Sequence, residues 1–246
     1  MIPIFTILTY AIIAVATASL IYGAYTDVKR RTVKALLFVP LMALGVSINF
    51  ILNIPIVFTA LGVAIFLFTF LEPDTYAYAI LSAGFMVISV ASVFLVGFYW
   101  GFQLLAISVI YALGFTERLF GIGDIKGIIA LMFSSPLYSP AAETILFGHV
   151  TFVVIPTSLS IMVDVAIFSV MFILYTVYLA RKHGTVSIKG EPLAIRFNEE
   201  LAQRNPEVYK VGERDGTKYM IYRIPFMVAI LLGYIMFVII GSPIFL

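Results

Sequence analysis

The sequence predicts an all-α polytopic membrane protein with about eight transmembrane helices, six at the fewest, and a small cytoplasmic insert before the last helix. Of its 246 residues, 62% are apolar and only 11% are charged, and the mean hydropathy is +1.10. A soluble domain carries about 25% charged residues. The charge-free stretches have about the 20-residue length of a membrane span, and the basic residues fall in alternate loops. These three observations set the fold class.

The composition also excludes several classes of protein. A soluble fold of this size could not bury so much apolar surface, which excludes a water-soluble enzyme. A disordered chain or a nucleic-acid-binding domain needs far more charge. Cysteine is absent, which removes disulfides, thiolate-bound zinc and thiol nucleophiles. His149 and His183 stand alone without ligand spacing, so no metal and no cofactor is expected.

Each predicted span ends at a charge cluster or a turn. The first lacks a basic start, so it is not expected to be a cleaved secretory signal. Residues 75–115 are uncharged over about twice the length of one helix, so we divide them in two near residues 97–101. Asn53 and Pro55 mark a tight turn. The predicted spans lie at 2–25, 35–52, 54–71, the two halves of 75–115, 125–140, 149–180 and 224–244.

Charge placement gives this map an orientation. If the N-terminus lies outside, the inward loops hold all 15 Lys and Arg residues of the chain, and the outward loops hold none. The positive-inside rule therefore favours eight spans in the plasma membrane with this orientation. The chain divides into a membrane domain at 1–180, a polar cytoplasmic insert at 181–223 and a final helix at 224–246. The lipid bilayer is the expected surrounding, and no contact with nucleic acid is expected.

The insert is too short to bury a core of its own, so we expect it to pack on the inner face of the membrane domain. Its residues 194–204 are predicted to form a short helix that stops before Pro206. Asp215 and Gly216 indicate the turn of a hairpin that ends at Tyr222.

Two acidic residues fall at the inner ends of predicted spans. Asp27 ends the first span, and Asp124 begins the sixth within Gly121-Ile122-Gly123-Asp124-Ile125-Lys126-Gly127. Four helices separate them, an even number, so both face the same membrane surface. A carboxyl group near hydrocarbon is costly and is a functional candidate by default.

Two neighbouring carboxyl groups can hydrolyse a peptide bond. At about 3 Å they share one proton, so that one activates a water molecule and the other polarises the carbonyl. Gly121 and Gly123 have no Cβ and would let a substrate strand approach closely. Each feature also has a structural interpretation. Asp27 could be a solvated charge at a helix end, and Gly121–Asp124 could be a loop whose aspartate caps the next helix.

These residues resemble the Gly-x-Gly-Asp membrane aspartic proteases, and among them the type IV prepilin and archaeal preflagellin peptidases. The first family motif is similar to Asp27–Val33 and the second to Gly121–Lys126. Presenilin-like proteases have Tyr before the first aspartate, whereas Thr26 stands there in this chain. The two aspartates are separated by more residues than is usual in the family, by about one helical hairpin.

The resemblance implies a function. Asp27 and Asp124 would be catalytic, with Gly121, Gly123 and Lys126 as supporting motif residues. The substrates would be precursor archaellins or pilin-like proteins, whose short basic leader is removed on the cytoplasmic side. The chain lacks the cysteine-containing N-terminal region of the bacterial enzymes, so cleavage without N-methylation is expected. The resemblance does not predict the oligomeric state.

Several residues keep alternatives open. Lys126 could tune Asp124, bind substrate or snorkel to the interface. Asp164 could be a structural acid bonded to Ser160 or Ser169, or a support for catalysis. Arg30 and Arg31 are predicted to be orientation signals. A small ion-coupled transporter that uses the intramembrane acids is the alternative function, and a presenilin-like protease that cuts transmembrane helices is a third.

Overall fold

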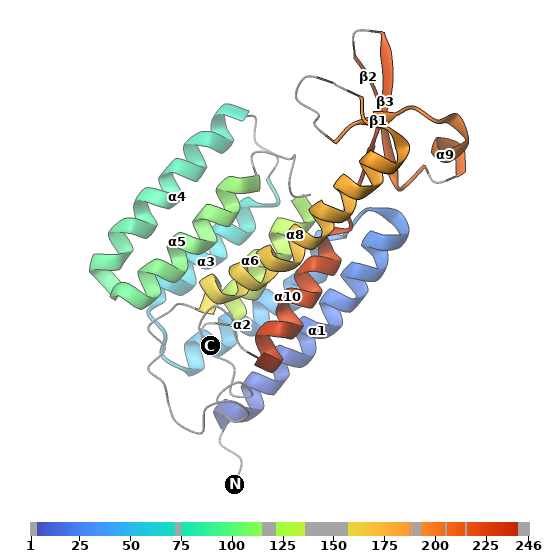
Figure 1. Cartoon of the computed structure of the whole chain (residues 1–246). Coiled ribbons are helices and arrows are strands. Elements are labelled where there is room, and N and C mark those ends of the chain that lie inside the picture. The colour runs from blue at the N-terminus through green and yellow to red at the C-terminus, as the bar shows by residue number, and fades with distance from the viewer. Residues whose placement is uncertain are drawn as a thin grey trace.

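The computed structural model describes residues 4–71, 75–114, 122–135, 157–186, 188, 193–204, 206–214 and 216–240. Within these residues the chain is a bundle of apolar helices with a small sheet at one end (Figure 1). The elements are α1 (Ile4–Arg30), η1 (Ala35–Phe38), α2 (Val39–Ile51), α3 (Ile56–Phe68), α4 (Thr75–Val96), α5 (Phe98–Leu113), α6 (Ile122–Ser134), α8 (Thr157–His183), β1 (Ile195–Arg196), α9 (Glu199–Arg204), β2 (Tyr209–Arg214), β3 (Thr217–Tyr222) and α10 (Phe226–Ile240).

The predicted helical class is confirmed, and each predicted span corresponds to an apolar helix in the described part of the chain. Three helical segments are long and apolar enough to cross a membrane, and they lie at Ile7–Arg30, Tyr76–Val96 and Thr157–His183. Other apolar helices, such as Ile56–Phe68, are shorter. The number of spans therefore stays a prediction. The parts of the predicted sixth and seventh spans at 136–140 and 149–156 lie outside the described residues.

Two turns form where the sequence predicts them. Asn53 has a φ of +53° and follows α2, where Ile54 donates a 2.9 Å backbone hydrogen bond to Asn49, so the chain reverses into α3. Gly97 has a φ of +91° and separates α4 from α5, which confirms the division of the long uncharged stretch. The two helices then pack closely, because a Cβ on Gly101 would lie 2.4 Å from Cα of Val93.

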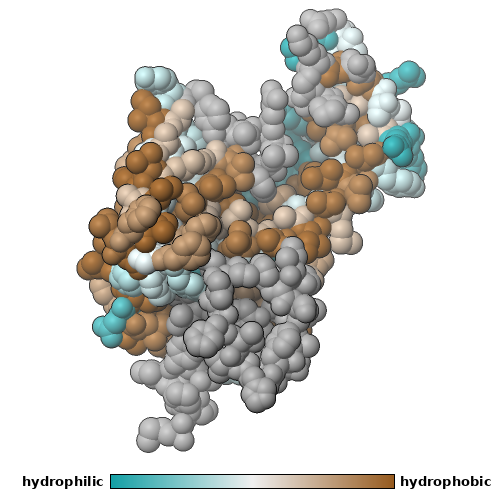
Figure 2. Space-filling model, turned by 60° about the vertical axis from the view of Figure 1, so that its left-hand side comes forward, coloured by the Kyte–Doolittle hydropathy of each residue, from teal (hydrophilic) through white to brown (hydrophobic). Residues whose placement is uncertain are grey.

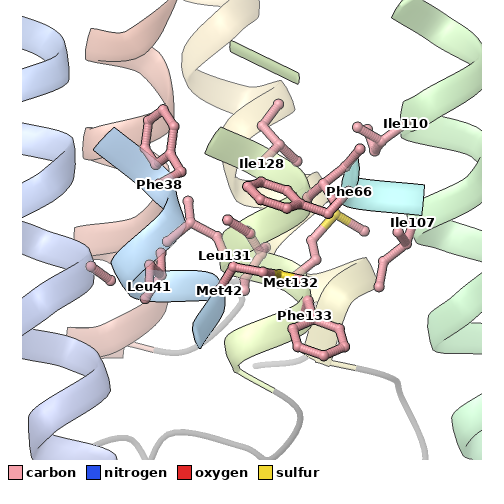
Figure 3. Packing of buried hydrophobic residues seen from close by; sticks show 14 of the residues in the cluster. Phe38, Leu41, Met42, Phe66, Ile107, Ile110, Ile128, Leu131, Met132 and Phe133 are labelled. Atoms are coloured by element: carbon pink, nitrogen blue, oxygen red, sulfur yellow. The ribbon is translucent and has the colours of Figure 1, made fainter. Parts of the chain in front are cut away.

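Helix α6 is the centre of the bundle. All of residues 124–135 are buried, and α1, α2, α3, α5, α8 and α10 all contact this helix. Figure 3 shows side chains from the surrounding elements around it. The residues labelled in Figure 3 belong to one cluster of buried hydrophobic side chains, and they are Phe38, Leu41, Met42, Phe66, Ile107, Ile110, Ile128, Leu131, Met132 and Phe133. This helix is therefore enclosed by its neighbours on every side, and its few polar side chains, Asp124 and Lys126 among them, are enclosed with it.

The outer helices expose large apolar side chains instead. On α4, Val87 is 68% exposed, Leu95 is 76% exposed and Phe94 is 86% exposed. Figure 2 shows hydrophobic surface over this flank of the bundle, and hydrophilic residues gather on the insert. Monomeric soluble proteins rarely expose apolar surface on this scale. The bundle therefore fits a lipid environment.

The insert follows the end of α8 and forms an antiparallel sheet in the order β1-β3-β2. The predicted hairpin is confirmed, with Gly216 at a φ of +74° between β2 and β3. The predicted helix at 194–204 is wrong in its first half. Ile195 and Arg196 pair with β3 instead, and the helix begins at Glu199 because the side chain of Asn198 accepts a 3.0 Å hydrogen bond from Leu201 N–H.

The insert has a small core that it shares with α8. Ala180 of α8 packs with Ile195 and Met220, each at most 2% exposed. The predicted boundary between residues 180 and 181 falls inside α8, which ends at His183. The last two turns of this helix therefore pack against the insert as well as the bundle.

Candidate active site at one end of the bundle

The two predicted catalytic segments lie at the same end of the helix bundle. Asp27 is in the last turn of α1 and Asp124 is in the first turn of α6, and these two helices contact each other. In Figure 1 this is the end that carries the insert, to which α8 leads and from which α10 returns. Both carboxyl groups are buried, with Asp27 at 7% and Asp124 at 8% exposure.

Asp27 is held by the start of α10. Its Oδ2 accepts a 3.0 Å hydrogen bond from the backbone N–H of Met227, the second residue of that helix. The first N–H groups of a helix have no partner within the helix and carry its positive dipole end. A carboxyl group from α1 thus caps a helix whose second residue lies 200 residues later in the chain. The solvated helix-end interpretation of Asp27 does not fit this burial.

The chain after Asp27 packs directly against the motif that contains Asp124. A Cβ on Gly123 would lie 3.1 Å from the carbonyl oxygen of Val33 and 3.2 Å from its Cβ. A side chain at position 123 would therefore press on the segment that follows α1. The space at this glycine is taken by the protein's own backbone, whereas the sequence predicted it for a substrate. Gly121 lies outside the described residues.

One buried aromatic ring connects the two segments. The Phe38 side chain is 0% exposed, and its Cζ would lie 3.8 Å from a Cβ on Gly23 and 2.9 Å from a Cβ on Gly127. Gly23 precedes Asp27 by one helical turn, and Gly127 follows Asp124 by almost one turn. Each aspartate therefore stands about one turn from the same ring, toward the same end of the bundle. The direct pairing of the carboxyl groups around a water molecule stays a prediction.

Lys126 lies in the interior at this end of the bundle. It is 8% exposed, and its Nζ is 4.4 Å from the centre of the Phe70 ring, which follows α3. A cation over an aromatic face is stabilised by the ring quadrupole. Snorkelling to the lipid interface does not fit this position. The ammonium group instead adds positive charge beside the motif of Asp124.

Arg31 is a site residue that sequence reasoning missed. Arg30 is exposed, as an orientation signal would be, but Arg31 is half-buried. The Arg31 Nη2 donates to the Tyr222 hydroxyl at 3.4 Å, and its Cζ lies 5.5 Å from the Tyr222 ring centre. Within a cluster of four basic residues nothing distinguishes Arg31, and its partner lies 191 residues away, so no sequence signal could have found this contact.

The other acidic candidate lies elsewhere. Asp164 is 0% exposed and belongs to the half of α8 farther from the insert. Its neighbour Val165 packs on Gly233 of α10, where an added Cβ would lie 2.7 Å from Val165 N. The hydroxyl of Ser169 donates to the Val165 carbonyl at 2.6 Å. Asp164 is therefore a core residue of the α8–α10 contact, away from the end that holds Asp27.

No group of three or more His, Cys, Asp or Glu side chains that could hold a metal occurs among the described residues. His183 closes α8, whereas His149 lies outside the described residues. In comparisons with known proteins the chain matches no family model, and no curated protein and no solved structure is significantly similar to it.

Proposed function

We propose that this protein is an aspartic endopeptidase that cleaves peptides at the boundary of the plasma membrane. One observation carries the proposal. Asp27 and Asp124 lie 97 residues apart in the sequence, yet α1 and α6 bring both to one end of the bundle, where both are buried. Two buried carboxyl groups can act as general acid and general base in the hydrolysis of a peptide bond, and this reaction needs neither a metal nor a thiol.

The reaction would use the two carboxyl groups in different protonation states. The ionised aspartate takes a proton from a water molecule, whose oxygen attacks the scissile carbonyl carbon. The protonated aspartate donates to the carbonyl oxygen. The tetrahedral intermediate then collapses as the C–N bond breaks: the amine leaves with the proton taken from water, and the hydroxyl that re-forms the carbonyl returns its proton to the second aspartate. Burial of the pair excludes bulk water and strengthens these interactions.

The proposed substrates are precursor archaellins or pilin-like proteins with a short basic leader. The motif resemblance at Asp27–Val33 and Gly121–Lys126 supports this class. We place the N-terminus outside and the site on the cytoplasmic face, which is supported by the 15 Lys and Arg residues of the predicted inward loops. The product is expected to leave without N-methylation.

The test is cleavage of a synthetic precursor by purified protein in detergent. The precursor carries a basic leader, a glycine before the cut and an apolar helix, and mass spectrometry locates the cut and any methyl group. Asp27→Asn and Asp124→Asn should each lower kcat at least about 100-fold, which is the usual contribution of one general acid or base. Both variants should express and unfold like the wild type.

Two control variants sharpen this result. Asp164→Asn changes a buried acid away from the site, and Glu213→Gln changes an exposed acid of β2. Both should cleave as the wild type does. Full activity of either dyad variant would reject the proposal. Proton-coupled uptake in vesicles, lost in Asp164→Asn and accompanied by no cleavage in the wild type, would favour the transporter.

A further inference from the structure

Arg31 is oriented by a closed chain of contacts around the candidate site. Its backbone N–H donates to the Asp27 carbonyl at 2.9 Å, and its guanidinium donates to the hydroxyl of Tyr222. Tyr222 ends β3, and five residues later Met227 donates its N–H to Asp27. The loop of contacts thus returns to the aspartate from which it began, and it joins α1, the insert and α10.

The partner of Arg31 is itself fixed. The ring of Tyr222 makes edge-on contacts with Tyr175 of α8, at 6.0 Å between ring centres, and with Tyr209 of β2, at 5.9 Å. Three aromatic rings from α8, β2 and β3 therefore pack together, and the guanidinium lies against one of them, Tyr222. A planar guanidinium on an aromatic face is held in one orientation, because the ring fixes its plane as well as its position.

The remaining donors of Arg31 have no acceptor among the described residues. Nε and Nη1 are both buried atoms, and neither makes a hydrogen bond with the part of the chain that the structure describes. A buried donor without an acceptor costs about 1–3 kcal/mol, and more when it is charged. The backbone conformation adds to this, because Arg31 has a φ of +52°, which is uncommon for a residue other than glycine. Such a costly arrangement calls for an oxygen atom that the described residues do not supply.

We propose that Arg31 is a substrate-positioning residue that binds a backbone carbonyl oxygen of the substrate peptide next to the scissile bond, with Tyr222 holding the guanidinium in place. This inference rests on the proposed peptidase function. The acceptor is a neutral main-chain oxygen, because every peptide substrate carries one next to the scissile bond. It lies beside Asp27, because Arg31 follows that residue by about one helical turn and its backbone N–H is bonded to the Asp27 carbonyl.

The test compares two adjacent arginines. Arg31→Met and Arg30→Met each remove one positive charge from the same loop, but Arg30 is exposed. Steady-state cleavage by Arg31→Met should show KM raised about 10- to 100-fold with a smaller change in kcat, the pattern of a lost binding interaction. Arg30→Met should match the wild type. Tyr222→Phe, which keeps the ring, should stay within about fivefold of the wild type, whereas Tyr222→Ala should resemble Arg31→Met and add nothing to it.

A second measurement uses wild-type protein and altered substrates. Leader peptides in which one carbonyl oxygen at a time is replaced by sulfur, a weaker acceptor, should lose affinity sharply at one position near the cut. Arg31→Met should lose nothing further at that position. This result would show contact with the substrate and not merely support of the insert. A flat profile along the leader in the wild type would overturn the assignment, even if Arg31→Met failed to fold.

The outcomes separate the two proposals. If the wild type cleaves and Asp27→Asn does not, but Arg31→Met and Arg30→Met behave alike, the peptidase stands and the role of Arg31 is rejected. If the wild type cleaves none of the peptides, the peptidase is rejected and this role falls with it.

Discussion

Replacement of Gly127 by alanine tests whether Phe38 couples the two catalytic segments. The new Cβ would lie 2.9, 3.2 and 3.3 Å from three carbon atoms of the Phe38 ring. Carbon atoms normally approach to about 3.5–4.0 Å, so the ring must move by about 0.5–1 Å. It cannot simply retreat, because the ring is fully buried among packed side chains. Overpacking of this kind costs about 1–3 kcal/mol.

The assay is unfolding of the purified protein in detergent, followed together with peptide cleavage. Gly84→Ala is the matched control, because a Cβ at Gly84 of α4 meets nothing within 4 Å. That variant should be unchanged or more stable by up to about 1 kcal/mol, since alanine favours the helix. Gly127→Ala should lose both stability and activity, because the displaced ring moves α1 relative to α6.

A second substitution tests the stated cause. In Gly127→Ala/Phe38→Leu the smaller side chain leaves room for the new methyl group. The double variant should therefore be more stable than the sum of the single effects predicts, by about 0.5–3 kcal/mol. Equal stability of Gly127→Ala and Gly84→Ala, or strict additivity in the double variant, would refute the coupling through Phe38.

Three further predictions follow from the same contacts. Asp27→Ala should destabilise the protein by about 0.5–2 kcal/mol, because Met227 N–H loses its acceptor, whereas Asp27→Asn keeps an amide oxygen for it and should unfold like the wild type; equal unfolding of the two variants would contradict this cap. Gly101→Ala should destabilise the α4–α5 hairpin by about 1–3 kcal/mol in the same assay, because its Cβ would collide with the Val93 backbone. Burial, and then the nearby Tyr222 and Tyr175, raise the pKa of Tyr209 above its ordinary 10.0. The stability contributed by that neutral hydroxyl is therefore complete below pH 10.0 and is lost as the pH rises through the higher folded value. Tyr209→Phe should remove this part of the alkaline unfolding of the insert, measured by circular dichroism from about pH 8 to about 11.

Hydropathy and turn chemistry predicted most of the helices in this chain. Asn53 with Pro55 gave a turn signal between two apolar runs, whereas the division near residues 97–101 followed from the length of the uncharged stretch, and both Asn53 and Gly97 have a positive φ. Periodicity could not predict β1, because its two residues are too few to show a pattern and depend on pairing with β3. Tertiary pairing, rather than local preference, determined the structure of that segment.

The candidate site could be predicted only in part, because some of its contacts also depend on tertiary pairing. Counting the predicted spans put Asp27 and Asp124 on one side of the membrane, and the structure places both at one end of the bundle. The bond from Met227 to Asp27 and the contact of Arg31 with Tyr222 join residues about 200 positions apart. Such contacts depend on how α10 and the insert fold back on α1, and no local pattern encodes them.

The energetics of burial argue that these charges are kept for more than packing. A carboxyl group within a span costs about 2.5–3.5 kcal/mol at the centre and less near the end. One hydrogen bond to a charged group stabilises the folded state by about 1.5–3 kcal/mol, so the bond from Met227 nearly offsets the free-energy cost of burying Asp27. A neutral side chain could cap α10 without that cost. Asp124 and Lys126 are buried in the same way, and Arg31 adds a second cation.

Two acids and two cations thus lie at one end of the bundle. If the acids share one proton, the group carries a net positive charge. Charge of this sign stabilises the oxyanion that develops when water attacks a peptide carbonyl. With both acids ionised the four charges would sum to zero, so the excess arises only with the shared proton that the proposed peptidase needs. The proposed peptidase would then use this excess in its transition state.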